Sequence, residues 1–342
     1  MAGQAPRRSA TQVDVARHAG VSTATVSRVL NGAGVVTPTA RARVEAAIDA
    51  LNYIPSSAAR SLASKRSHTL GAIVPTLTNA IFAEGLNGFE AGCRARGYTM
   101  LLAVSNYDLG GEEHLVRTMI ERGVEGIMLV GAEHTPRTFA LLDQAATHHV
   151  CAWTAPTPGA QAPAIGFANG AAMRAVVAHL QDRGHERIGM LSGETHGNDR
   201  ARERREAVAQ ALNSAGLPLI DGAFVEAPYT LSAARDALPA VLGTGITALI
   251  CGNDVLAVGA LFEAQRRGLT VPDELAITGF DDLPIAGEVS PAITTVRVPA
   301  AAMGARCADA LADALEANDP QSPPARVTCA TLQTELIIRE TT

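Results

Sequence analysis

The sequence of 342 residues has few aromatic side chains and no long apolar run. Phe, Trp and Tyr make up 4% of the chain, whereas apolar residues make up 47%. This composition favours closely packed helices and short turns, and the length predicts two or three domains. No apolar run is long enough to cross a bilayer. No apolar segment follows Arg7 and Arg8, so we expect no secretory signal, no membrane partner and a cytoplasmic protein.

Cysteine is also scarce, and the sequence lacks the common motifs of enzymes. The cysteines are odd in number, far apart and without a C-x-x-C pair, so they predict buried free thiols and no metal site. They are Cys93, Cys151, Cys251, Cys307 and Cys329. We find no phosphate-binding P-loop and no G-x-S-x-G motif, and His148-His149 is too weak a metal signal. The sequence therefore predicts a protein that is not an enzyme, with no cofactor and no catalytic residue.

Charge is distributed unevenly along the chain. Residues 1–66 carry nine Lys and Arg against three Asp and Glu, whereas the remainder is strongly acidic and brings the net charge to −6. A basic segment gains affinity for DNA because each phosphate contact releases counterions. We therefore expect the N-terminal end to contact nucleic acid.

Residues 11–32 have the pattern of a helix-turn-helix. Thr11 and Asp14 fit the N-cap and third position of a first helix. Gly20 supplies the tight turn, and Ser22 caps a second helix whose outer face would enter the major groove. The core side chains expected are Val15, Ala16, Ala19, Val21, Val26, Val29 and Leu30. An ordinary helical hairpin is the alternative, but the small residues, the basic surroundings and a third helix after Thr37-Pro38 favour a DNA-binding head.

The run from Asp14 to Gly32, together with Leu51–Pro55, resembles the signature of the lactose-repressor (LacI/GalR) family. The resemblance implies that Thr23, Ala24 and Arg28 face bases, with Arg28 suited to guanine; simple groove packing is the alternative for Thr23 and Ala24. The full set of expected DNA-binding residues is Thr11, Ser22, Thr23, Ala24, Thr25, Ser27, Arg28, Asn31, Tyr53 and Leu62.

Residues 55–67 are expected to form a hinge between head and body. The segment is too short and polar to be a stable helix alone, so it would fold only with DNA and a partner subunit. In the family that the head resembles, a leucine at the place of Leu62 wedges into the minor groove and kinks the duplex. A flexible linker with an incidental leucine is the alternative.

From residue 68 onward, short apolar runs alternate with longer amphipathic stretches, which predicts parallel α/β folding. The expected fold class is α/β: a three-helix helix-turn-helix head (residues 1–54) and two doubly wound parallel-sheet lobes (residues 68–342), similar to type I periplasmic-binding proteins. Lobe 1 would comprise about 68–168 and 299–326, and lobe 2 about 169–298 and 327–342. A ligand is expected in the cleft between the lobes, at the carboxyl ends of the strands.

Seven residues are the expected effector contacts. Asp254 follows the apolar run 248–251 and could accept hydrogen bonds from hydroxyl groups. The family resemblance implies that Arg202 points into the cleft and that Tyr229 covers the ligand, although Arg202 could be one of several surface arginines in 200–205. The remaining candidates are Asn79, Phe82, His134 and Arg137. Asp281 and Asp282 are instead interpreted as a strand end and a helix cap.

The sequence departs from the family where carboxylates are common. Ala168 stands where many relatives carry an aspartate, and Trp153-Thr154 lies near another such place. Fewer carboxylates would favour a bound anion, because charge-assisted arginine pairs are strong. The stretch 134–138 and the run 251–260 resemble gluconate-type repressors, so we expect gluconate or another sugar acid as effector.

These features together predict a homodimeric transcription regulator that reads a pseudo-palindromic operator on double-stranded DNA. Effector binding would change the closure of the lobes and release the operator. The alternatives are a co-repressor or activator of the same family, and a solute-binding protein, which predicts a signal peptide and no basic head.

Overall fold

The computed structural model describes residues 10–31, 35–54, 66–317 and 326–342. The chain divides into two compact units, Met1–Ser67 and His68–Thr342. No helix in these described ranges is both long and apolar enough to span a membrane.

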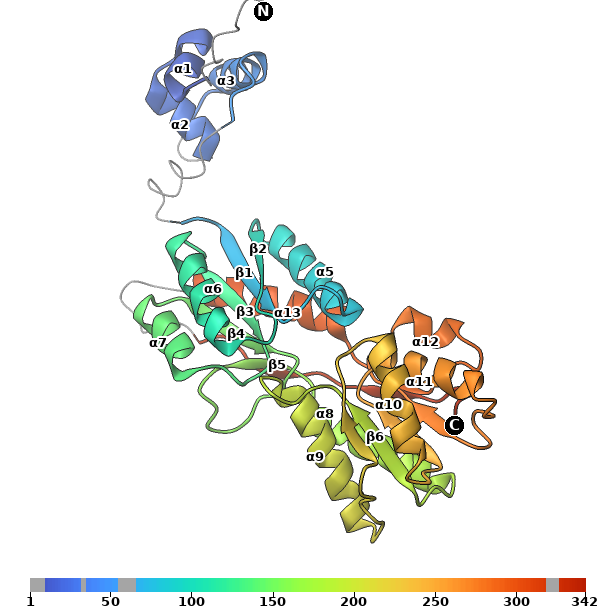
Figure 1. Cartoon of the computed structure of the whole chain (residues 1–342). Helices are drawn as coiled ribbons and strands as arrows, with labels where there is room; N and C mark the ends of the chain where they lie inside the picture. Colours follow the sequence, from blue (N-terminus) through green and yellow to red (C-terminus); the bar gives the residue numbers. More distant parts are fainter. Residues whose placement is uncertain (1–9, 32–34, 55–65, 318–325) are drawn as a thin grey trace, which may run out of the picture. The chain divides into compact units, whose positions relative to one another are not determined.

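The first unit is a three-helix head comprising α1 (Gln12–Ala19), α2 (Thr23–Asn31) and α3 (Pro38–Ala50) (Figure 1). The predicted capping box is confirmed: the Thr11 hydroxyl accepts from the Asp14 amide, and the Asp14 carboxylate accepts from the Thr11 amide. Gly20 ends α1 with φ +61°, a left-handed conformation that glycine adopts at little cost. Val15, Val26, Val44 and neighbouring alanines form the head's own core.

Lobe 1 of the second unit is built on a six-stranded parallel sheet in the order β11-β5-β4-β3-β1-β2. Its strands are β1 (Thr69–Val74), β2 (Thr99–Val104), β3 (Gly126–Val130), β4 (His148–Ala152), β5 (Ala164–Gly166) and β11 (Ala330–Thr331). Two helices, α5 (Ala80–Ala95) and α13 (Ala300–Glu316), lie side by side on one face (Figure 1). Two others, α6 (Leu109–Glu121) and α7 (Pro136–Gln144), cover the opposite face and its apolar side chains, which include Ile73, Ile127 and Leu129.

Lobe 2 contains a four-stranded parallel sheet in the order β7-β6-β8-β9. Its strands are β6 (Ile188–Ser192), β7 (Phe224–Glu226), β8 (Ala248–Cys251) and β9 (Ala276–Thr278). The helices α8 (Asn169–Asp182) and α9 (Asp199–Ser214) pack together, as do α10 (Leu231–Leu242) and α11 (Asp254–Arg266). A short helix, α12 (Pro284–Glu288), and an antiparallel pair, β10 (Thr295–Arg297) with β12 (Glu335–Ile337), complete the lobe.

The predicted fold class is confirmed, with one correction at the last crossing between the lobes. Residues 327–342 were expected in lobe 2, but Ala330–Thr331 pair with β5 in the sheet of lobe 1. Two residues of parallel pairing are too short to leave a clear signal in the sequence. The expected burial of all five thiols is also corrected, because Cys329 is exposed.

The sensor unit has one large hydrophobic cluster that runs through both lobes. It joins Leu70 and Met128 of the first sheet to Ile188 and Ile250 of the second, through helices that include α13. The two lobes therefore share one buried apolar cluster.

Candidate functional site

The outer face of α2 carries small polar side chains and one arginine. Ser22, Thr23, Ala24 and Arg28 are exposed, while Thr25 and Ser27 are half-buried. The inward Val26 and Val29 anchor this helix in the head's core, so the face that they leave outside matches the one expected to enter a major groove.

The other expected DNA-binding residues either make contacts within the head or lie outside the residues that the structure describes. The Thr11 hydroxyl is engaged in the capping box, and the Ser22 hydroxyl accepts from the Thr25 amide at 3.2 Å. Tyr53 packs against the core of the head. The side chain of Asn31 and the whole of Leu62 lie outside the described residues.

In the sensor unit, a narrow cavity lies between the two lobes at the carboxyl ends of the strands. The cavity volume is about 20 Å³, which is room for about one water molecule. Lobe 1 and lobe 2 both contribute side chains to its wall, which comprises Asn79, Ile81, Phe82, Tyr107, Trp153, Phe167, Asn198, Arg200, Arg204, Tyr229, Asn253 and Asp281. A ligand the size of a sugar would therefore need the lobes to move apart.

Several polar atoms of this wall are buried without a hydrogen-bond partner in the described part of the chain. They are Oδ1 of Asn79, Nε1 of Trp153, Nε of Arg204 and Nδ2 of Asn253. Buried polar groups in native proteins are nearly always satisfied, and each exception calls for an explanation such as a water, an ion or a ligand. These atoms offer three donors and one acceptor to a polar ligand.

Among the residues that the structure describes, Arg204 is the buried cation of the cavity that lacks a hydrogen-bonded carboxylate partner. Its Nη1 donates to Oδ1 of Asn169 at 2.8 Å, and its Nη2 donates to the Tyr229 hydroxyl at 3.0 Å. Its guanidinium also lies 4.7 Å from the centroid of the Phe280 ring. These neutral partners fix the position of the guanidinium without cancelling its charge.

Asp281 is the acidic residue of the cavity wall, and it is only 8% exposed. Burial raises the pKa of its carboxyl group well above the ordinary value and nearby Asp254 raises it further, whereas Arg204 lowers it. The carboxyl group is therefore shifted towards its neutral form, in which it can donate a hydrogen bond.

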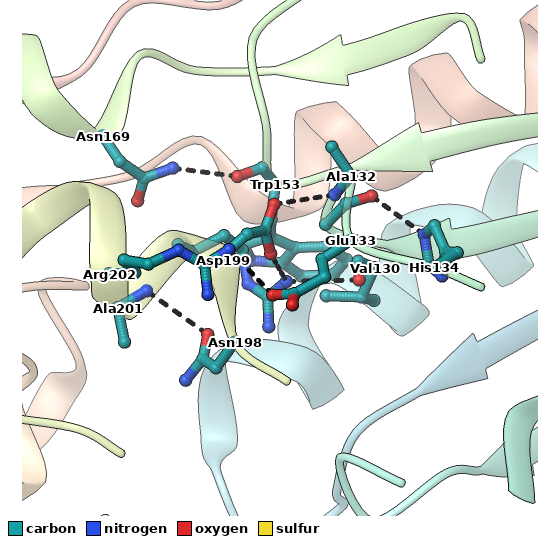
Figure 2. A network of polar contacts seen from close by, with 12 residues as sticks. Val130, Ala132, Glu133, His134, Trp153, Asn169, Asn198, Asp199, Ala201 and Arg202 are labelled. Carbon is teal, nitrogen blue, oxygen red and sulfur yellow. Dashed lines mark hydrogen bonds and ion pairs between the residues drawn. The ribbon is translucent and has the colours of Figure 1, made fainter. Parts of the chain in front are cut away.

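Direct contacts join the two lobes beside the cavity, at an edge that we call the rim (Figure 2). Arg200 is paired with Asp199 at 2.7 Å and also donates to the Val130 carbonyl in lobe 1 at 3.2 Å. Arg202 forms an ion pair of 2.8 Å with Glu133 of lobe 1. Unlike Arg204, both of these arginines are compensated by carboxylates.

Three of the seven expected effector contacts, Asn79, Phe82 and Tyr229, lie in the cavity wall, and four lie elsewhere. Asp254 is fully buried and accepts from the Leu283 amide and the Thr295 hydroxyl, at 2.6 Å and 2.5 Å. The remaining three, Arg202, His134 and Arg137, pair with Glu133, Glu112 and Glu113.

Sequence reasoning missed Arg200, Arg204, Trp153 and Asp281. The helical spacing of apolar residues could have identified the two arginines. Arg202 and Arg205 lie outside the buried face of α9, which contains Arg200, Ala201, Arg204, Ala207 and Val208. The interpretation of Asp281 as only a strand end is corrected, because its side chain faces the cavity.

Comparison with known proteins identifies the family. A model described as bacterial regulatory proteins of the lacI family matches residues 11–56, and a periplasmic binding protein-like domain matches residues 177–342. The ribose operon repressor of Escherichia coli (strain K12) is 34% identical over 305 residues, which cover 88% of this chain and 92% of the relative. This chain belongs to the LacI family of transcription regulators.

Further matches support the same placement of this LacI-family repressor. The HTH-type transcriptional regulator GntR of Escherichia coli (strain K12) is 34% identical, over 87% of this chain and 89% of the relative. The solved structure of a LacI-family transcriptional regulator from Silicibacter pomeroyi matches with a TM-score of 0.86 and 27% identity, over 97% of this chain and 99% of that one. The resemblance inferred from residues 14–55 is thus confirmed, and the chain is a DNA-binding transcription repressor.

Proposed function

We propose that this LacI-family repressor controls genes for the catabolism of a sugar acid, such as gluconate, and leaves its operator when that acid binds between the lobes. It would act in the cytoplasm as a homodimer, with residues 1–54 reading DNA, residues 55–67 forming the hinge and residues 68–342 sensing the effector.

The observation that carries the effector class is that buried Arg204 makes no hydrogen bond or ion pair with a carboxylate among the described residues. A buried cation is costly unless it is paired, and the partners of Arg204 are an amide, a phenol and an aromatic ring. Its Nε–H is buried and unpartnered. A ligand carboxylate would supply the missing negative charge through a strong charge-assisted hydrogen bond.

The hydroxyl groups of a sugar acid would find partners in the rest of the wall. The unpartnered amides of Asn79 and Asn253 and the indole Nε1 of Trp153 suit hydroxyl groups, and the Phe82 and Trp153 rings, 5.3 Å apart, offer apolar faces to the carbon chain. The ribose operon repressor among the relatives also favours a sugar-derived effector.

A thermal-shift panel of neutral sugars, sugar acids and purines on the full-length protein tests this proposal. A ligand at about 100 times its dissociation constant stabilises the folded state by about 2.7 kcal/mol, which gives a clear shift in Tm. We expect a shift with aldonates such as D-gluconate that is absent with the matching neutral sugar, D-glucose. Shifts with neutral sugars alone would show that Arg204 reads hydroxyl groups and that the effector is not an acid.

A further inference from the structure

We propose that an interlobe latch, formed by the loop Val130–Glu133 of lobe 1 and the residues Asp199–Arg202 of lobe 2, holds the sensor closed without any effector. The latch residues would thereby set how readily the cavity opens and how tightly it retains a ligand. This inference rests on the proposed function only in taking the cavity as the effector site.

Three contacts make up the interlobe latch (Figure 2). The Ala132 amide donates to Oδ2 of Asp199 at 2.7 Å. Nη1 of Arg200 donates to the Val130 carbonyl at 3.2 Å, and Nη2 of Arg202 pairs with Oε2 of Glu133 at 2.8 Å. Every one of these contacts joins atoms of different lobes.

The latch is almost entirely separate from the cavity wall. Of its residues only Arg200 lines the cavity, and both polar contacts of its Nη1 are made within the protein, to Val130 and Asp199. Closure of this rim therefore needs no group from a ligand.

The lobe 1 half of the latch is anchored from within its own lobe. His134, the next residue along, forms a 2.6 Å contact with Glu112, and both side chains are nearly fully buried. Burial lowers the pKa of His134, but its Cys151 and Glu112 neighbours raise the pKa by more, to about 10. Its other ring nitrogen contacts the Gly131 carbonyl at 3.2 Å. A loop already fixed in this way loses little conformational entropy when the rim closes.

Gly131 shows how closely the two halves meet. Its φ is +88°, and a Cβ atom added to it would lie 2.0 Å from Nη1 of Arg200 and 2.4 Å from Oδ1 of Asp199. Even a methyl group at this position would displace the Arg200 and Asp199 side chains from their contacts in the latch.

The latch lies away from the strands through which the chain passes between the lobes. Its loop follows β3, which β4 separates from the edge formed by β5 and β11. Contacts far from the axis of a hinge oppose its opening more effectively than contacts beside the axis, because they act over a longer lever arm. If only the closed sensor retains a ligand, the apparent dissociation constant rises in inverse proportion to the closed fraction.

The test measures the separation of the lobes with no effector present. Spin labels at Ala140→Cys on α7 and Gln210→Cys on α9, both exposed positions, report the interlobe distance in the full-length protein. A Cys329→Ser background removes the exposed thiol and leaves the four buried ones. Distances are measured by double electron–electron resonance.

Two latch variants, each with a matched control, distinguish loss of the latch contacts from other effects of the same substitution. Arg202→Gln breaks the interlobe ion pair, whereas Arg205→Gln breaks the Arg205–Glu226 pair, whose residues both belong to lobe 2; the two arginines are each 41% exposed. Gly131→Ala blocks the latch, whereas Gly159→Ala has a similar φ of +78° with no atom within 4 Å of the added Cβ.

We expect Arg202→Gln to lower the closed-to-open ratio by about 1.4- to 5-fold, the range for exposed ion pairs. Gly131→Ala should shift the distances further, and both controls should match the parent. Distance distributions for Arg202→Gln and Gly131→Ala that coincide with those of their controls would overturn the latch. Because no effector is used, a shift in distance would uphold the latch even if no sugar acid binds.

Discussion

Arg204 and Asn169 form a buried hydrogen bond of 2.8 Å in which a cation meets a neutral acceptor. Asn169 is fully buried, and its own Nδ2 donates to the Trp153 carbonyl at 3.0 Å. One turn earlier on the same helix, Arg200 meets the carboxylate of Asp199 instead. The cavity thus contains two buried arginines, of which one is paired with a carboxylate and the other is hydrogen-bonded to neutral groups.

Replacing Arg204 by Met should remove the response to sugar acids. A hydrogen bond to a charged group contributes about 1.5–3 kcal/mol, so the dissociation constant for D-gluconate should rise by at least about ten-fold in isothermal calorimetry. Arg205→Met, on the same helix but outside the cavity wall, is the control. Equal affinities of both variants would exclude Arg204 as the carboxylate-binding group.

Replacing Asn169 by Asp should change which ligand charge is accepted. The new carboxylate would pair with Arg204 and cancel its charge, so binding of D-gluconate should weaken while binding of a neutral sugar does not. Asn213→Asp adds the same charge at an exposed position of α9 and is the control. A thermal-shift comparison of the two variants gives the result, and unchanged selectivity would show that Asn169 has only a packing role.

Replacing Arg28 by Ala should weaken and broaden operator recognition. A bidentate arginine–guanine contact discriminates by about 1–3 kcal/mol, so affinity for an operator selected from random DNA should fall by about 5- to 160-fold. Fluorescence anisotropy at fixed salt measures this. Arg41→Ala on α3 serves as the control for a general loss of positive charge, and an equal drop on selected and random DNA would mean that Arg28 contacts only phosphate.

The buried Asp254 should make the sensor less stable as pH rises. Burial is the largest effect on this carboxyl group and raises its pKa from 3.8 to about 7, although bonds from Thr295 and Leu283 oppose the shift. The folded state therefore binds the proton more tightly than the unfolded state. Its contribution to stability is complete below pH 3.8 and is lost as pH rises through 7, at up to about 1.4 kcal/mol per pH unit.

Asp254→Asn, which cannot ionise, isolates this contribution. Urea unfolding of both proteins between pH 4.5 and 8 should show the free-energy difference moving in favour of the variant as pH rises. A difference that stays constant over this range would mean that the folded and unfolded pKa values of Asp254 are the same.

The head was predicted closely because its signals are local. Thr11, Asp14 and Gly20 act within one helix and its turn, so cap chemistry alone places α1 and its end. Strands of the sensor were found for a similar reason, since an apolar run such as 248–251 is buried along its whole length.

The site was predicted only in part because distant residues decide which side chains face the cavity. Asp254 stands at the carboxyl end of β8, as expected, but Leu283 and Thr295, 29 and 41 residues further along, engage both of its oxygens. Arg202 was expected to point into the cleft, but it pairs with Glu133, 69 residues away, outside the cavity wall. No local pattern contains these pairings.

The hydrophobic cluster that runs through both sheets has a consequence for how the sensor melts. Because apolar side chains of both lobes pack together in this cluster, unfolding one lobe would expose apolar surface of the other. Calorimetry should accordingly resolve a single cooperative transition for the sensor, while the head, which has its own core, melts separately. A destabilising substitution deep in one lobe would then lower the melting temperature of the whole sensor, including the lobe that it does not touch.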